Sequence, residues 1–239
     1  MTTSQSANPS ITPAADEPGP ALHAAARAGD LLAVSAILAA DPEAAGWRDP
    51  DGESALVAAA FRGHRPIAEL LATRVALDVW EAALMGDVAR LRALCAEDPA
   101  RVDARRHDGW TPLHLAGFYG HPEVVRALLE LGAEPSILGH NALGNTPLHA
   151  VLAMSGNDRV VELLVAGGAD VAFRAAGGYT PLHLAASRGN VPAMLLLLAK
   201  GASPAARSDD GRTAADIAAE RGHLDVARVL AEAAGAAPS

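Results

Sequence analysis

The sequence predicts an all-α protein built as a solenoid, a stack of similar helical units, and two regularities support this. The tetrapeptide Thr-Pro-Leu-His occurs three times, at Thr111–His114, Thr146–His149 and Thr180–His183, with starts 35 and 34 residues apart. A glycine also follows nine residues after the motif start in most copies. Self-similarity with a period in the thirties is typical of solenoids, whose units bury their apolar faces only against each other.

The same register extends in both directions to seven copies. Their starts lie near Pro20, Ser54, Leu77, Thr111, Thr146, Thr180 and Thr213. The glycine nine residues after the start occurs in six copies, at Gly29, Gly63, Gly86, Gly120, Gly189 and Gly222. In the fifth copy it comes one residue later, at Gly156. Two independent markers in step indicate one continuous series of repeats.

Each copy is predicted to form a helix, a tight turn and a second helix. In the fourth copy Thr111 can cap a helix that has Pro112 at its first position, where the missing N–H costs nothing. Gly120 ends this helix, and Gly132 ends the next one. The apolar residues of the second helix share the spacing of one buried stripe: Val124, Val125, Leu128 and Leu129.

The stretch between copies is polar and ends in a turn pair. Three of these pairs are Asp-Gly and one is Gly-Gly, which are residues that favour hairpin turns. They are Asp51-Gly52, Asp108-Gly109, Asp210-Gly211 and Gly177-Gly178. We therefore expect β-hairpin-like finger turns between the helix pairs.

These motifs resemble the ankyrin repeat over roughly residues 19–235. The residues that carry the resemblance are Thr111–Ala116, Thr180–Ala186, the turns Gly63-His64, Gly120-His121 and Gly222-His223, and Gly168–Asp170. The resemblance implies paired antiparallel helices with protruding fingers, stacked into a curved body with a concave face.

Two departures from the pattern bear on the architecture. The second copy is ten residues short, so its second helix, from Pro66 to about Thr73, passes almost directly into Leu77–Leu84 without a finger. We expect a break or a change of curvature near residues 73–78. The first and third copies share an Asp-Pro ending, at Asp41-Pro42 and Asp98-Pro99, which suggests a duplication of two repeats.

The chain ends and the composition indicate a cytoplasmic protein. Residues 1–18 are rich in Ser, Thr, Pro and Ala and lack a basic segment before an apolar run, so we expect a disordered tail and no signal peptide. Residues 236–239 form a short C-terminal tail, and no stretch of the chain has the apolar length of a membrane span.

The single cysteine, Cys95, aligns with Leu129 on the buried side of a helix and favours a reducing compartment. The net charge of −9 argues against nucleic-acid binding, and we expect a monomer.

No catalytic, metal or cofactor site is predicted, although the chain has nine histidines. Four occupy the motif position, where the imidazole can bond the Thr hydroxyl of its own copy and a neighbouring backbone group: His23, His114, His149 and His183. Three more follow the turn glycine, and His107 and His140 are isolated on connectors.

Gly139–Thr146 has the glycines of a phosphate-binding loop, but Asn145 stands where a lysine is needed and no strand precedes it. Enzyme activity is therefore not expected.

The resemblance implies a binding surface at the fingers and at the exposed end of each first helix. In this chain those positions lie seven and eight residues after the motif start and one residue before it. Five of the eight aromatic residues fall there, and aromatics with Met and Arg are typical interface anchors. The alternative is that these rings pack between adjacent fingers and helices. The candidate partner-binding residues are Phe61, Arg62, Leu84, Met85, His107, Trp110, Phe118, Tyr119, Tyr179 and Arg188.

The favoured hypothesis is a non-catalytic protein-interaction scaffold whose concave face, centred on the second to fourth copies, binds a protein of unknown identity. One alternative is an enzyme or a small-ligand-binding protein that holds its ligand in a cleft at the fingerless junction near Val75–Met85. Another is a regulatory subunit of an enzyme or complex encoded nearby. The fold hosts many unrelated functions, so the partner's identity cannot be inferred from this sequence.

Overall fold

The computed structural model describes residues 17–140, 142 and 144–235 and divides the chain into two units, Met1–Ala76 and Leu77–Ser239. Residues 1–16 and 236–239, where we expect tails, lie outside the described residues. The boundary between Ala76 and Leu77 falls inside the fingerless junction at which the sequence predicts a break. Each unit is described by itself.

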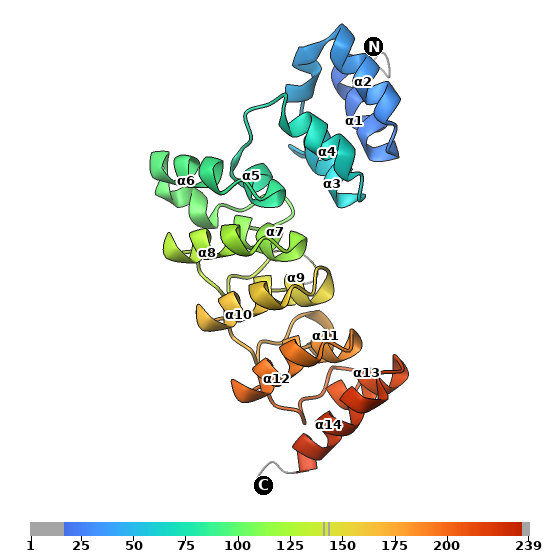
Figure 1. Cartoon of the computed structure of the whole chain (residues 1–239), viewed down its shortest axis with the longest axis vertical. Coiled ribbons are helices and arrows are strands. Elements are labelled where there is room, and N and C mark those ends of the chain that lie inside the picture. Colours follow the sequence, from blue (N-terminus) through green and yellow to red (C-terminus); the bar gives the residue numbers. More distant parts are fainter. Residues whose placement is uncertain (1–16, 141, 143, 236–239) are drawn as a thin grey trace, which may run out of the picture. The chain divides into compact units, whose positions relative to one another are not determined.

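Residues 17–76 of unit 1 form two helix pairs and one short 3₁₀ segment (Figure 1). The elements are α1 (Pro18–Ala28), α2 (Leu31–Ala40), η1 (Pro42–Gly46), α3 (Ala55–Phe61) and α4 (Arg65–Ala72). The helix α1 packs against both α2 and α3, and α3 packs against α4. The two first helices thus share an interface, as the repeat register predicts.

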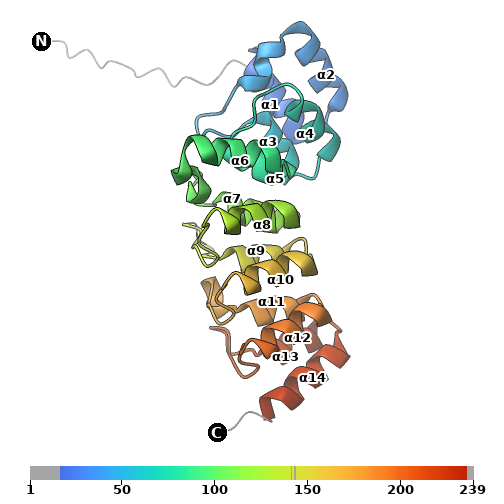
Figure 2. The same ribbon diagram turned by 60° about the vertical axis from the view of Figure 1, so that its left-hand side comes forward.

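The described residues of unit 2 stack five further pairs, with the first helices in one row and the second helices in another (Figure 1). The pairs follow one another along the stack in chain order (Figure 2). The pairs are α5 (Val79–Met85) with α6 (Val88–Glu97), α7 (Pro112–Tyr119) with α8 (Pro122–Glu130), α9 (Pro147–Ala153) with α10 (Asp158–Ala166), α11 (Pro181–Ser187) with α12 (Val191–Ala199), and α13 (Ala214–Glu220) with α14 (Leu224–Gly235). Two 3₁₀ segments complete it, η2 (Pro99–Asp103) and η3 (Ala176–Gly178). The described residues are thus α-helical in all seven copies, which confirms the predicted fold class.

The first helices begin where the capping residues place them. Thr111 caps α7 with its side chain receiving the backbone N–H of His114, while the His114 ring receives the backbone N–H of Thr111. The same reciprocal capping box starts α9 and α11. Each box satisfies two backbone N–H groups that the first turn would otherwise leave without partners. The Thr-Pro-Leu-His motif is therefore a helix start, as predicted.

The third copy starts one residue later than the register predicts. Asp78 caps α5, with Glu81 as its reciprocal partner, because Leu77 has no side-chain oxygen that could accept a hydrogen bond. The helix is therefore counted from Asp78, and this shift affects one of the candidate binding residues.

The fingers are tight turns that pack closely on one another. Gly109 has φ of 79°, and a Cβ placed there would lie 2.4 Å from the backbone nitrogen of His140 on the next finger. Only glycine fits such a backbone conformation and approach. Isolated antiparallel bridges pair Arg48 with Ser54 and Arg207 with Thr213, which makes these fingers hairpin-like.

The core between the helix rows is aliphatic. Side chains on both helices of the fourth copy are fully buried: Leu113, Leu115, Ala116, Val124, Val125 and Leu128. Cys95 is buried, as expected, and its burial raises the pKa of the thiol. Among the described residues no helix has both the length and the apolar character needed to span a bilayer.

Candidate functional site

The motif histidines link each copy to the finger that precedes the next copy. Nδ1 of His114 lies 2.9 Å from the Thr111 hydroxyl, and Nε2 lies 3.1 Å from the backbone carbonyl oxygen of Asn145. Nδ1 also accepts the Thr111 backbone N–H, so Nε2 carries the proton and donates to the carbonyl. His149 and His183 repeat this arrangement, with Nε2 lying 3.2 Å from the Tyr179 and Arg212 carbonyl oxygens respectively.

These three imidazoles are buried and electrically neutral. Burial lowers the pKa of His114 and of His149 to about 4, and it also lowers the pKa of His183. Both ring nitrogens of each are committed to protein partners. These three motif histidines therefore link neighbouring copies, as expected, and both nitrogens of each ring are engaged.

Other side chains make equivalent links where the motif departs from its usual form. Trp80 on α5 donates its indole N–H to the backbone carbonyl oxygen of Ala104 at 2.9 Å. This hydrogen bond joins the first helix of the third copy to the segment that follows η2. His64 and His121, which follow turn glycines, reach back to the Arg27 and Leu84 carbonyl oxygens at 3.2 and 2.8 Å. Neighbouring segments of the array are thus linked by more than one kind of side chain.

The candidate binding residues differ in exposure. Four are exposed: Phe61, Arg62, His107 and Arg188. Four are half-buried: Met85, Phe118, Tyr119 and Tyr179. Leu84 and Trp110 are buried, so they cannot offer a side chain to a partner as predicted.

Trp110 is buried because it belongs to an aromatic cluster at the start of the fourth copy. Its ring stacks on His114 at 5.7 Å and meets Phe118 edge-on at 5.2 Å. Phe118 in turn meets Tyr119 edge-on at 5.1 Å, and Tyr119 stacks on His121. Phe118 and Tyr119 are therefore not the solvent-facing rings that the sequence led us to expect; much of their surface packs within the repeat.

Leu84 is buried because α5 starts at a different residue. Counted from the cap at Asp78, Leu84 stands six residues into the copy. Gly117 and Ala186 stand at the same distance from their caps, and both are buried. Met85, one residue further on, takes the more exposed position.

A pocket of about 460 Å³ lies between α11 and α13, in the sixth and seventh copies. Its walls come from the finger before each helix and from the helix ends, which are the positions expected to bind a partner. The lining residues are Tyr179, His183, Leu184, Ser187, Arg212, Ile217, Glu220 and Arg221. Tyr179 and Arg212 both precede a motif start, and Ser187, Glu220 and Arg221 stand seven or eight residues after one.

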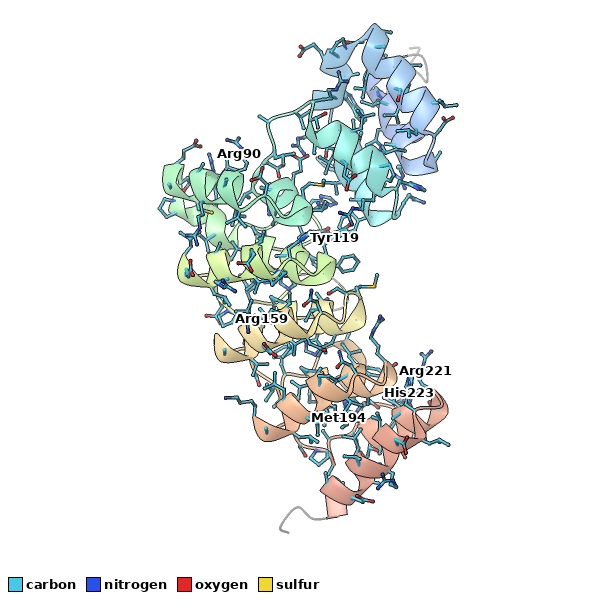
Figure 3. The ribbon with its side chains drawn as sticks, viewed as in Figure 1. Arg90, Tyr119, Arg159, Met194, Arg221 and His223 are labelled. Carbon is cyan, nitrogen blue, oxygen red and sulfur yellow. The ribbon has the colours of Figure 1, made fainter. Side chains whose placement is uncertain are left out.

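The pocket contains two arginines, of which one is ion-paired with acidic side chains and the other is not paired with a described residue. Arg212 pairs with Asp210 at 2.6 Å and with Glu220 at 2.9 Å, and it contacts the Tyr179 hydroxyl. Arg221, at the end of α13 (Figure 3), is exposed and makes no ion pair with a described residue. The pocket thus has one guanidinium held by two carboxylates on its wall and another, at its edge, that forms no ion pair with the described part of the chain.

One further cluster brings together residues that sequence reasoning did not connect. Nε2 of His23 on α1 lies 3.4 Å from a carboxylate oxygen of Glu53 and 3.9 Å from one of Asp49. The separations of 26 and 30 residues match no common motif, and only the fold of the first finger brings these groups together.

Comparison with known proteins agrees with this geometry. The family model for an ankyrin repeat matches residues 108–140, and the model for three copies of ankyrin repeats matches residues 148–239. This chain belongs to the ankyrin-repeat family.

Curated relatives match the ankyrin array over less than half of this chain. The ankyrin repeat and SAM domain-containing protein 6 of Mus musculus is 37% identical over 45% of this chain and 12% of its own length. The serine/threonine-protein kinase VIK of Arabidopsis thaliana is 38% identical over 40% of this chain and 21% of its own length. The SH3 and multiple ankyrin repeat domains protein 1 of Homo sapiens is 34% identical over 43% of this chain and 5% of its own length. The similarity spans a small part of each relative.

Proposed function

We propose that this ankyrin array is a non-catalytic binding protein that holds a partner polypeptide along the finger ends and first-helix ends of unit 2. The pocket between α11 and α13 receives a side chain of that partner. The observation that carries the proposal is the position of the pocket, because its lining residues occupy equivalent register positions in two consecutive copies. A site built from equivalent positions of stacked repeats suits an extended chain that runs along the stack.

The sixth and seventh copies fit this role better than the second to fourth copies, where we expected the binding surface from the sequence. In the fourth copy the rings of Trp110, Phe118 and Tyr119 contact one another. Around the α11/α13 pocket, Tyr179 is half-buried like Phe118 and Tyr119 and contacts His183 and Arg212, but Arg188 and Arg221 are exposed. Tyr and Arg beside a concave pocket are the residue types that most often dominate binding energy.

The charges favour a partner that presents a carboxylate. Arg212 is held by two acidic groups, whereas the Arg221 guanidinium is not paired with a described residue. A carboxylate entering the pocket would gain a charge-assisted hydrogen bond from Arg221, and such bonds are stronger than neutral ones. We therefore expect an Asp, a Glu or a C-terminal carboxylate at the bound position.

Affinity measurement of pocket variants tests this proposal. A partner identified by affinity capture and mass spectrometry is titrated against the wild type, Ser187→Arg, which fills the pocket, and Arg221→Glu, which reverses the unengaged charge. Binding should weaken by about 1–3 kcal/mol in both variants. The control is Arg228→Glu, which makes the same charge change on α14 at an exposed position. Equal affinity in all four proteins would place the partner elsewhere.

The pocket volume also favours a second candidate function, the binding of a small ligand. A volume of about 460 Å³ lies within the range of small-molecule sites. A small carboxylic acid would use the same Arg221 contact. A thermal-shift screen of carboxylate metabolites separates the two functions, because a small ligand should raise the melting temperature of the wild type and not of Arg221→Glu.

A further inference from the structure

Unit 1 contains an arrangement around His23 that differs from the other three motif histidines. In His114, His149 and His183, Nε2 donates to the backbone oxygen of the residue before the next motif start, at 3.1 to 3.2 Å. The equivalent residue for His23 is Glu53. The His23 Nε2 atom is buried and has no hydrogen-bond partner among the described residues, and two carboxylate oxygens lie within 4 Å of it.

The first finger orients both carboxylates toward that nitrogen. Oδ1 of Asp49 accepts the backbone N–H groups of Asp51 at 3.0 Å and of Glu53 at 2.7 Å. This bonding fixes the carboxylate and leaves Oδ2 facing His23, 3.9 Å from Nε2. Oε1 of Glu53 lies 3.4 Å from the same nitrogen. The turn that builds the finger therefore also positions two acidic oxygens.

We propose that His23, Asp49 and Glu53 form a binding site for a divalent transition-metal ion, with Zn²⁺ as the representative ion. One imidazole nitrogen and two carboxylate oxygens are a donor set that such ions accept. The three ligand atoms lie within 4.8 Å of one another. Ligands about 2.1 Å from a tetrahedral ion are roughly 3.4 Å apart, so side-chain shifts of about 1 Å complete the site.

The surroundings of the cluster suit a cation. Nε2 of His23 is buried without a hydrogen-bond partner among the described residues, and an ion would supply the missing partner. The ring also contacts Trp47 edge-on at 5.6 Å, which limits its rotation. The side chains of Asp49 and Glu53 are 17% and 21% exposed, which leaves a path for the ion and for a water molecule as a further ligand.

Metal titration of the full chain tests the site. Protein stripped with a chelator is titrated with Zn²⁺ by calorimetry and with Co²⁺ by visible absorption, which reports the coordination of the ion. We expect saturable binding of one ion, with affinity reduced by at least about tenfold in Asp49→Asn and in Glu53→Gln. Asparagine at position 49 keeps the oxygen that accepts the two turn N–H groups, so the finger should remain folded.

The matched control is Asp51→Asn, which removes the same charge from an exposed residue of the same finger. It should bind Zn²⁺ as the wild type does, and Zn²⁺ should raise the melting temperature of both by more than that of Glu53→Gln. Three results would overturn the proposal: no saturable binding, unchanged affinity in Asp49→Asn and Glu53→Gln, or an equal loss in Asp51→Asn. The second result would assign binding to other histidines, and the third would assign it to the charge of the finger as a whole.

Discussion

The hydroxyl of Thr146 lies 2.8 Å from Nδ1 of His149, and the opposite nitrogen of that ring lies 3.2 Å from the backbone oxygen of Tyr179. One buried side chain thus caps its own helix and holds the finger that leads into the next copy. Because neighbouring units of a solenoid stabilise each other, a contact of this kind contributes to the stability of the array as well as to one helix.

His149→Ala is expected to lower the free energy of unfolding by roughly 1–3 kcal/mol. The substitution removes the reciprocal cap at Thr146 and leaves the Tyr179 carbonyl without its donor. Thr146→Ala should cost a similar amount, because it removes the other half of the cap. Urea denaturation followed by circular dichroism measures both.

The control for this prediction is His140→Ala, together with His107→Ala. Both residues are exposed on connectors, so each change should stay within about 0.5 kcal/mol. Equal losses in all four variants would mean that the motif histidines hold no special position in the stack.

The buried histidines also predict how stability depends on pH. The pKa values of His114 and His149 are lowered to about 4, against an ordinary value of 6.5. Between these values the unfolded chain binds more protons than the folded chain, so stability is complete above pH 6.5 and falls as the pH drops toward 4. Each of the two histidines should account for about 3 kcal/mol of that loss.

Unfolding measured from pH 7 to pH 4 tests this dependence, with His149→Ala as the comparison. The variant is less stable at pH 7 but should lose less stability on acidification, since one of the titrating groups is gone. Asp210 titrates in a different window: hydrogen bonds from Arg212 and Ser208 lower its pKa to about 2, so its effect appears only below pH 4. A pH profile of the same slope in both proteins would contradict the assignment to His149.

Phe118→Ala with Tyr119→Ala should lower stability by about 2 kcal/mol or more, because the edge-on contacts with Trp110 and between the two rings are lost. Thermal melting measures the loss. Leu195→Ala on α12 is the control, since Leu195 is 53% exposed and its removal should be near neutral. An unchanged melting temperature in the double variant would return these rings to the role of exposed anchors.

The helix pairs, the caps and the role of the motif histidines could be predicted because they depend on residues within one copy. Thr111, Pro112 and His114 specify a helix start locally, and the repeat period supplies the stacking partner. The burial of Leu84 could have been found by preferring Asp78 to Leu77 as a cap. That signal was present in the sequence.

The pocket and the His23 cluster could not be predicted in the same way. Each depends on the distance between side chains of different copies, or of a helix and a later finger. The aromatic cluster lies within the fourth copy, but its ring contacts depend on side-chain packing that the motif does not specify. Arg212 meets Glu220 within one copy but reaches Tyr179 of the copy before it, and His23 meets Glu53 only through the path of the first finger. A repeat pattern indicates that copies stack, whereas such contacts depend on the side-chain geometry of the stack.

The most direct test of the central claim is site-specific photo-crosslinking in the native host. A photoreactive phenylalanine analogue replaces Arg188, an exposed residue beside the α11/α13 pocket, in one protein and Leu195 on α12 in the control. We predict that position 188 crosslinks one discrete protein, that added Arg221→Glu strongly reduces the product, and that position 195 gives none. The same crosslinked protein at position 195, or a product at 188 that is unchanged by Arg221→Glu, would contradict a partner bound in this pocket.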